Sequence, residues 1–342
     1  MTEPTTPALQ TYDLGPFALA SGHTLPEAVL AYRTIGTLNE AADNVVLLPH
    51  MYSGTSEFMT AFIGPGRPLD PDRWFFVLPA QFGSGESSSP SNTALPYQRG
   101  AFPAVATGDD VRAQNRLLTE HLGVEQLAMV SGWSMGGQQT LDWAVRFPDM
   151  VQRAVSFAAT ASNPDHCRVF CDLHMDAIRS DPAFADGFYA DRADVHLGLR
   201  RHAQAFALMG ASSHMYRGEV WRELGFSSLQ GFVQGFLQGY FGPMDPNDLL
   251  CQAAKWKVSD VGDVTGGDTD AALGRITAAV TDVAFTGDLF FPPEDIAADA
   301  AKIPGAEHRE IGSVWGHFTM FNLREQDTAE IDAVYQQALA GA

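Results

Sequence analysis

The sequence predicts an α/β fold in which a mostly parallel central sheet is flanked by helices and carries a helical insertion. Short apolar runs, rich in Val and Phe and closed by turn residues, alternate with helical periodicity along residues 45–157. The same alternation resumes at about residue 276, whereas the stretch between contains helical candidates and no convincing strand. Alternating strands and helices are typical of a parallel sheet.

The expected elements are justified in chain order. Residues 12–38 alternate loosely and are broken by glycines, so we expect an antiparallel start to the sheet. Helices are expected at residues 109–122, stopped by Gly123, and at 137–147, stopped by Pro148, with a further helix at the C-terminus. Strands are expected at residues 45–48, 74–78, 127–130, 151–157 and 283–285, and a weak strand at 308–311.

These elements divide the chain into a discontinuous core and an insertion. We expect residues 1–160 and 276–342 to form the α/β core, and residues 161–275 to form a helical cap over the sheet. Inside the cap, Gly231, Gly235 and Gly239 recur every four residues. Phe232, Phe236 and Tyr240 do the same one position later. The glycines and the aromatic residues form two adjoining stripes on one helix. Either another subunit or the cap's own core can pack on these stripes, and we predict a homodimer formed through them.

Composition excludes several classes of protein. The 342 residues are 45% hydrophobic and 18% charged, which is ordinary for a globular protein. The formal net charge of −20 repels phosphate backbones and anionic lipid, so we expect no nucleic-acid or membrane partner. Three cysteines are too few for a disulfide framework, and the N-terminus shows no leader pattern. We therefore expect a cytoplasmic protein.

The strongest motif is the run Gly132-Trp133-Ser134-Met135-Gly136-Gly137, which matches G-x-S-x-G. It follows an expected strand and precedes an expected helix, and this context gives the motif its meaning. The tight turn needs small neighbours and lifts the Ser134 hydroxyl above the sheet. The Met135 amide, at the helix N-terminus, can then donate to a developing oxyanion. We predict that Ser134 is a nucleophile.

A serine nucleophile needs a base and an orienting acid, expected in the order Ser, Asp or Glu, His. Asp288 follows an apolar strand, where α/β sites assemble, and His317 lies in a loop before the last helix. The rival acids are less well placed: Asp282 opens its strand, and Glu294 and Asp295 begin a helix after two prolines. We predict the set Ser134, Asp288 and His317.

A second oxyanion donor is expected from the loop after an early strand. The loop is Pro49 to Gly54, and we select the Tyr52 amide. His50 lies in the same loop and is expected to brace it.

A competing constellation is the cluster His166, Cys167, Cys171 and His174, whose spacing could hold zinc. Cysteines on helices usually behave as small buried hydrophobes, so we predict no metal site. Gly83-Ser84-Gly85 lacks the further glycine of a dinucleotide motif, and no P-loop pattern occurs, so no cofactor is predicted.

Several segments together resemble the homoserine O-acetyltransferase family, whose members have the α/β-hydrolase fold. The resemblance spans nearly the whole chain. It implies the triad Ser134, Asp288 and His317, the oxyanion donors Tyr52 and Met135, and pairing through cap helices. The matching segments are residues 32–39, 44–54, 132–149, 177–182, 288–293 and 316–317.

Departures from that family point to a different substrate. Met175 stands where the transferases place the Arg that holds an amino-acid carboxylate, and Phe318 stands where they place an Asp near the amine. Trp133, before the nucleophile, replaces their usual Gly. An apolar pocket cannot compensate an ammonium and a carboxylate. We therefore assign all three to the substrate pocket.

The predicted function is a serine-dependent acyl-ester hydrolase that works through an acyl-enzyme, with a small-molecule ester as substrate. The alternative is an O-acyltransferase that uses acyl-CoA and an alcohol other than homoserine. A non-catalytic binding protein on the same scaffold is a third possibility, which labelling with a fluorophosphonate discriminates.

Overall fold

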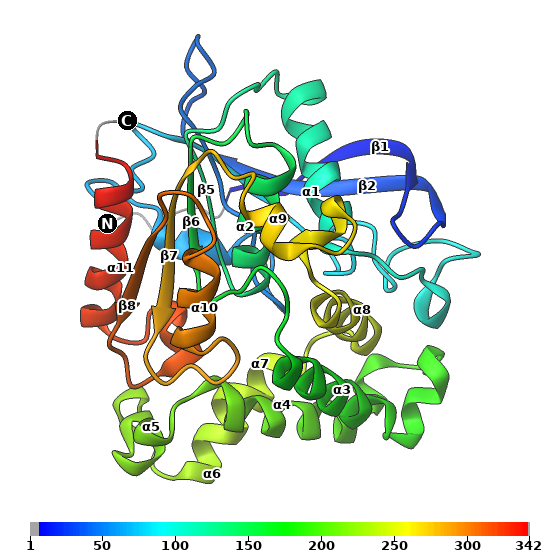
Figure 1. Cartoon of the computed structure of the whole chain (residues 1–342). Coiled ribbons are helices and arrows are strands. Elements are labelled where there is room, and N and C mark those ends of the chain that lie inside the picture. The colour runs from blue at the N-terminus through cyan, green and yellow to red at the C-terminus, as the bar shows by residue number, and fades with distance from the viewer. Residues whose placement is uncertain (1–6, 341–342) are drawn as a thin grey trace.

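The structure is a computed structural model and describes residues 7–340. An eight-stranded sheet lies at the centre of the molecule, with spatial order β1-β2-β4-β3-β5-β6-β7-β8 (Figure 1). β2 pairs antiparallel with both β1 and β4, and the other pairs are parallel. The predicted mostly parallel sheet with an antiparallel start is confirmed. The strands are β1 Gln10–Ala18, β2 Thr24–Ile35, β3 Val45–Leu47, β4 Phe75–Pro79, β5 Met129–Trp133, β6 Arg153–Phe157, β7 Ala279–Phe285 and β8 Glu307–Ile311.

The fifth strand differs from its expected bounds. β5 continues past Val130 to Trp133, because Val130–Trp133 pair in parallel with Ala154–Phe157 of β6. The strand therefore runs directly into Ser134. Gly132 is a residue type typical of turns, so the sequence predicted that the strand ends before it. In the structure, hydrogen bonds from β6 keep this segment extended.

Helices cover both faces of the sheet and one of its ends (Figure 1). α1 continues into a π-helical turn at Leu117–His121, before Gly123 with a φ of +68°. The helices are α1 Thr107–Arg116, α2 Met135–Arg146, α3 Asp165–Arg179, α4 His196–Gly210, α5 Ser213–Arg217, α6 Leu229–Phe232, α7 Gly239–Phe241, α8 Pro246–Lys257, α9 Thr269–Leu273, α10 Pro293–Ala300 and α11 Glu325–Ala338. Among residues 7–340, none of these helices combines the length and apolar character needed to cross a bilayer.

The alternation of side chains along the buried strands sends them to two cores. Leu47 of β3 packs in one cluster with Leu141 and Trp143 of α2. Val46 faces the other way and packs with Tyr335 of α11. Successive strand residues point to opposite faces, so a strand covered on both sides is apolar at every position.

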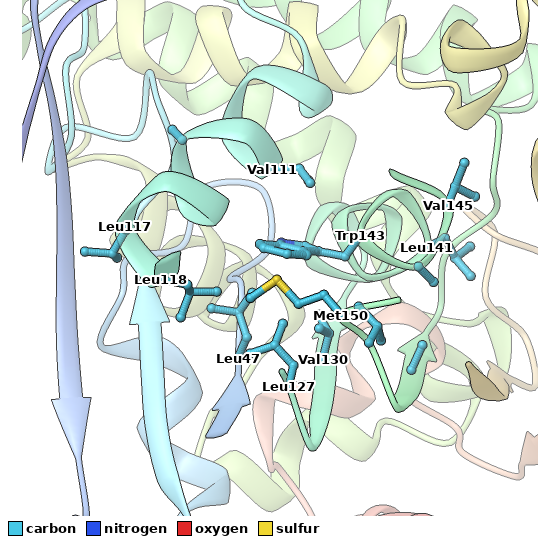
Figure 2. Close-up of a cluster of buried hydrophobic side chains, with 14 of the residues drawn as sticks. Leu47, Val111, Leu117, Leu118, Leu127, Val130, Leu141, Trp143, Val145 and Met150 are labelled. Carbon is cyan, nitrogen blue, oxygen red and sulfur yellow. The ribbon is translucent and has the colours of Figure 1, made fainter. Parts of the chain in front are cut away.

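Trp143 is the central side chain of the first core. Figure 2 shows its ring between the sheet residues Leu47 and Val130 on one side and Val111 of α1 on the other. The indole N–H donates to Gln114 Oε1 at 2.8 Å, so the buried ring carries no unpaired donor. This packing holds α2, the helix that follows Ser134, against the sheet.

The helical insertion lies between β6 and β7, and α3 to α7 gather at one end of the sheet (Figure 1). The segment that leaves the core and the segment that returns to it lie side by side, because Ser162 and Asp260 form an antiparallel bridge. Val261 and Leu273 already pack in the α/β core cluster. The last part of the expected cap, residues 161–275, therefore packs directly against the α/β core.

A buried ion pair fastens the insertion to the core. Lys255 of α8 and Asp110 of α1 are both fully buried, and Lys255 Nζ lies 2.5 Å from Asp110 Oδ2. Lys255 also donates to the Phe82 carbonyl at 2.9 Å, and the Phe82 amide donates to Asp110 at 2.7 Å. Burial raises the pKa of Asp110 to about 6. Removing one partner of such a pair leaves an uncompensated charge, which typically costs about 3–5 kcal/mol.

Candidate active site

Ser134 lies at the sharp turn between β5 and α2. Its backbone has φ 58° and ψ −121°, a sparsely populated conformation that costs on the order of 1–3 kcal/mol. A Cβ at Gly132 would lie 2.4 Å from the Gly136 carbonyl, and one at Gly136 would lie 2.3 Å from the Pro49 carbonyl. Both positions therefore require glycine, which is the steric reason for the motif.

The three side chains selected from the sequence form one hydrogen-bonded chain. His317 Nε2 lies 3.0 Å from Ser134 Oγ, and His317 Nδ1 lies 2.7 Å from Asp288 Oδ2. All three residues are at most 5% exposed. This is the arrangement in which an imidazole can accept a serine proton while a carboxylate holds its other nitrogen.

Asp288 is fixed by the turn that follows β7. Its Oδ1 accepts the amides of Phe290 at 2.8 Å and Phe291 at 3.1 Å, which leaves Oδ2 free for the histidine. The rival acids lie elsewhere: Asp282 is buried within β7, and Glu294 and Asp295 occupy the first turn of α10.

Met135 and Tyr52, whose backbone amides are the oxyanion donors expected from the sequence, both lie close to Ser134 in the structure. Met135 is the first residue of α2, so its N–H has no acceptor within the helix. Tyr52 is 4% exposed and lines the same cavity as Ser134. Its ring stacks on Phe206 of α4 at 5.4 Å, and its hydroxyl lies 3.4 Å from His202 Nε2. Burial raises the pKa of the Tyr52 phenol and lowers the pKa of His202 to about 3, so both groups are neutral near pH 7.

The loop that carries Tyr52 is held mainly by the insertion. The Ser53 amide donates to Gln252 Oε1 of α8 at 3.1 Å, and the Tyr240 hydroxyl donates to the Ser53 carbonyl at 3.0 Å. His50 braces the other end, since its Nε2 accepts the Gln81 amide at 3.2 Å while Nδ1 donates to the Met51 carbonyl at 2.8 Å. Burial lowers the pKa of His50 to about 4, so it stays neutral.

Ser134 and His317 open on a cavity of about 370 Å³. Aromatic side chains dominate its wall, and the described lining residues include no Lys, Arg, Asp or Glu. The insertion and the α/β core supply the wall in nearly equal shares. The lining residues are Met51, Tyr52, Ser53, Phe58, Trp133, Ser134, Phe206, Phe226, Gly235, Phe236, Leu237, Tyr240, Phe241, Trp256, His317, Phe318 and Phe321.

The structure brings two of the three expected pocket residues to this cavity. Trp133 lines it, with its ring centroid 5.2 Å from that of His317, and Phe318 lines it beside the histidine. Met175 does not: it is 4% exposed and packs in the apolar cluster of the insertion, outside the lining. Met175 is therefore a packing residue of the insertion and does not line the cavity beside Ser134.

The histidine and cysteine cluster on α3 is dispersed. His166 is exposed, and its Nε2 lies 3.1 Å from the carbonyls of both Leu289 and Phe290. Cys167, Cys171 and His174 are buried, and Cys167 and Cys171 belong to the apolar cluster of the insertion. Within residues 7–340, no group of three or more His, Cys, Asp or Glu side chains is placed to hold a metal ion.

Comparison with known proteins agrees with this geometry. Residues 44–322 match the family model described as the alpha/beta hydrolase fold. The chain belongs to the alpha/beta hydrolase family.

Comparison with individual relatives shows which members of the family this hydrolase resembles. It is 44% identical to an ethyl acetate hydrolase from Pseudomonas veronii, over 96% of this chain and 94% of that protein. The structure of an acetylester hydrolase from Corynebacterium glutamicum superposes with a TM-score of 0.96 at 41% identity, covering 98% and 96% of the two chains. A homoserine O-acetyltransferase from Geobacter sulfurreducens is 32% identical over 87% of this chain and 89% of that one.

The hydrolase is therefore an enzyme, an esterase of the alpha/beta hydrolase fold. The resemblance to homoserine O-acetyltransferases is genuine but more distant than the relation to esterases.

Sequence reasoning did not identify most of the wall of this esterase's cavity. Phe206, Phe226 and Trp256 lie in separate parts of the insertion, and Phe58 and Phe321 lie in the core. The only signals were the 22 phenylalanines of the chain and the aromatic stripe at Phe232, Phe236 and Tyr240. Neither signal says which rings face the nucleophile.

Proposed function

We propose that the esterase cleaves short-chain, uncharged esters through an acyl-enzyme on Ser134. Ser134 Oγ attacks the ester carbonyl while His317 Nε2 takes its proton. Asp288 holds the imidazole and stabilises its cation, and the amides of Tyr52 and Met135 stabilise the oxyanion. The C–O bond to the alcohol then breaks, and His317 returns the proton to the leaving oxygen.

Water completes the cycle. His317 takes a proton from a water molecule, whose oxygen attacks the acyl carbon. The bond to Ser134 Oγ breaks, and the proton passes back to the serine. The balance is one ester and one water consumed, with one carboxylic acid and one alcohol released.

The observation that carries the proposal is the continuous hydrogen-bonded chain from Asp288 through His317 to Ser134, which ends in an aromatic cavity. The cavity volume of about 370 Å³ is near the lower end of small-molecule sites, about 300–1,000 Å³. The names of the relatives, an ethyl acetate hydrolase and an acetylester hydrolase, support acetate esters of small alcohols as the substrate class.

The cavity wall favours hydrolysis over acyl transfer from acyl-CoA to an amino-acid acceptor. The described lining residues carry no cation that could pair with a CoA phosphate or an amino-acid carboxylate. Phe318 follows the histidine directly and offers no charge to an ammonium group. Each lost charge-assisted contact costs on the order of 1.5–3 kcal/mol.

We expect p-nitrophenyl acetate to be hydrolysed and L-homoserine to be a poor acyl acceptor. The measurement is product formation from p-nitrophenyl acetate, and separately from acetyl-CoA, with and without millimolar L-homoserine. The proposal is supported if p-nitrophenyl acetate is hydrolysed at the same rate with and without L-homoserine, and needs no acetyl-CoA. Rapid formation of O-acetylhomoserine from acetyl-CoA would instead establish the transferase.

We also propose that the esterase forms a homodimer through its insertion and resides in the cytoplasm. The resemblance to the transferases supports pairing, and three free cysteines suit a reducing compartment. Gly235 already accommodates Phe226 of its own chain, because a Cβ there would lie 2.6 Å from that ring. Gly239 is exposed and has only its own helix nearby, so it is the better interface probe.

Light scattering should give twice the chain mass of 36.9 kDa for the wild type. Gly239→Glu should shift the mass towards that of one chain, because a charge at an apolar contact disfavours association. A wild-type mass of one chain at micromolar concentration would refute the dimer.

A further inference from the structure

We propose that Ser212 is a positioning residue of the insertion, and that it holds the loops of Asp288 and His317 at the separation that their hydrogen bond requires. Ser212 lies between α4 and α5 and is 3% exposed. It does not line the cavity beside Ser134, so its effect on the reaction passes through other residues. The inference rests on the mechanism proposed above and adds a residue on which the alignment of acid and base depends.

Ser212 packs against the two residues that directly precede the acid and the base. A Cβ on Gly287, the residue before Asp288, would lie 2.9 Å from Ser212 Cβ. A Cβ on Gly316, the residue before His317, would lie 3.2 Å from the Ser212 backbone nitrogen. That Cβ on Gly316 would also lie 2.8 Å from the Gly287 carbonyl oxygen. The three residues therefore meet with too little room for a further side chain.

The hydroxyl of Ser212 adds a directed bond to the histidine loop. Ser212 Oγ donates to the carbonyl of Val314, three residues before His317, at 2.6 Å. The same oxygen accepts the Met215 amide at 3.3 Å and so caps the first turn of α5. One side chain therefore joins the start of an insertion helix to the loop that carries the proposed base.

The end of α4 contacts the same loop. Two residues before Ser212, the backbone of Gly210 lies against the ring of Phe318, and a Cβ on Gly210 would overlap that ring. Phe318 is the residue directly after His317. The connection between α4 and α5 therefore contacts the loop on both sides of His317, at Phe318 after it and at Val314 before it.

The α/β core holds these two loops where they leave their strands. The Thr286 amide, at the end of β7, donates to the Ile311 carbonyl of β8 at 3.0 Å. The Ser313 amide donates to Thr286 Oγ1 at 3.1 Å. Ser212 adds a contact further along each loop, at the residues next to the acid and the base.

The spacing of the two loops determines the geometry of the hydrogen-bonded chain. His317 Nδ1 lies 2.7 Å from Asp288 Oδ2, and His317 Nε2 lies 3.0 Å from Ser134 Oγ. A shift of the histidine loop changes both distances together. Reacting groups must be held within about 0.5 Å of their productive positions, and a misplacement of about 1 Å can lower the rate by about a hundredfold.

The first test measures kcat and KM of the full-length enzyme for p-nitrophenyl acetate. Ser212→Ala should lower kcat by about tenfold to a hundredfold, because the histidine loop loses its bond to the insertion. KM should stay near its wild-type value, because Ser212 does not line the cavity. Far-UV circular dichroism checks that the variant is folded.

Ser228→Ala is the matched control for loss of the helix cap. Ser228 is exposed in the same insertion and caps α6 by accepting the Gly231 amide at 3.0 Å, as Ser212 caps α5. It makes no bond to the loop of either Asp288 or His317. Ser228→Ala should therefore keep the kcat of the wild type.

A second readout reports on the acid and base directly. The proton between His317 Nδ1 and Asp288 Oδ2 gives a proton NMR signal far downfield of the backbone amides, because it is held in a short hydrogen bond to a carboxylate. Ser212→Ala should shift or broaden this signal, and Ser228→Ala should leave it unchanged. A role confined to the stability of α5 would not move it.

A further pair of variants tests the contact from the opposite side. Gly287→Ala places a methyl group 2.9 Å from Ser212 Cβ, so the two segments must move apart and kcat should fall. Ser212→Gly should lower kcat when made alone, but raise it when added to Gly287→Ala, because the collision is removed. The strain of Ala at a φ of +76° is common to both proteins and cancels in this comparison. Residues in contact show such non-additive effects.

The proposal is overturned if Ser212→Ala matches Ser228→Ala in either kcat or the NMR signal. It is also overturned if Ser212→Gly lowers kcat by the same factor with and without Gly287→Ala. A wild-type enzyme that hydrolyses no ester would instead refute the proposed function. In that case the NMR comparison of Ser212→Ala with Ser228→Ala still decides the positioning role.

Discussion

Ser134→Ala should lower kcat for p-nitrophenyl acetate by roughly a millionfold, the size of effect expected when a serine nucleophile is removed. The variant keeps the cavity and both proposed oxyanion donors but has no atom that can form the acyl-enzyme. Ala has the same backbone cost as Ser at φ 58°, and the one hydrogen bond lost, to His317, is worth about 1 kcal/mol. We therefore expect the melting temperature to change little.

The matched control is Ser213→Ala, which removes an exposed serine hydroxyl at the start of α5. It should retain full activity and full labelling by a fluorophosphonate, whereas Ser134→Ala should lose both. Retention of more than a few per cent of turnover in a correctly folded Ser134→Ala variant would remove Ser134 from the mechanism. It would also revive the interpretation of the fold as a non-catalytic binding protein.

Asp288→Asn should lower kcat by about ten-thousandfold, with a much smaller change in KM. In the wild type, Oδ1 accepts two amides and Oδ2 accepts from His317 Nδ1. In the variant, the amide oxygen keeps the two backbone N–H groups, so the NH₂ group faces His317. The imidazole then presents its protonated Nε2 to Ser134 and cannot accept the serine proton.

Glu294→Gln is the control for Asp288→Asn, because it removes a nearby carboxylate that is exposed in the first turn of α10. Its activity should stay close to that of the wild type. If Glu294→Gln were as severe as Asp288→Asn, the acid would have to be reassigned.

Local sequence patterns identified the chemical core of this enzyme. Part of the G-x-S-x-G turn is specified by contacts within a few residues, because a side chain at Gly132 would collide with the Gly136 backbone. The apolar runs that become β3, β4 and β5 reflect burial on both faces, which is a property of each strand alone. The order Ser134, Asp288, His317 then left few ways to arrange nucleophile, acid and base, and the resemblance to a known family pointed to the same residues.

The substrate site was decided by tertiary structure. The Tyr52 loop is held by Gln252, Tyr240 and His202, which lie more than a hundred residues further along the chain. Met175 aligned with a substrate ligand of the transferases, yet α3 packs so that this side chain faces the apolar interior of the insertion. Such contacts join segments with no shared periodicity, and their geometry depends on how whole helices pack. A sequence pattern reports which face of a helix is apolar, but only the packed structure determines which other residues that face meets.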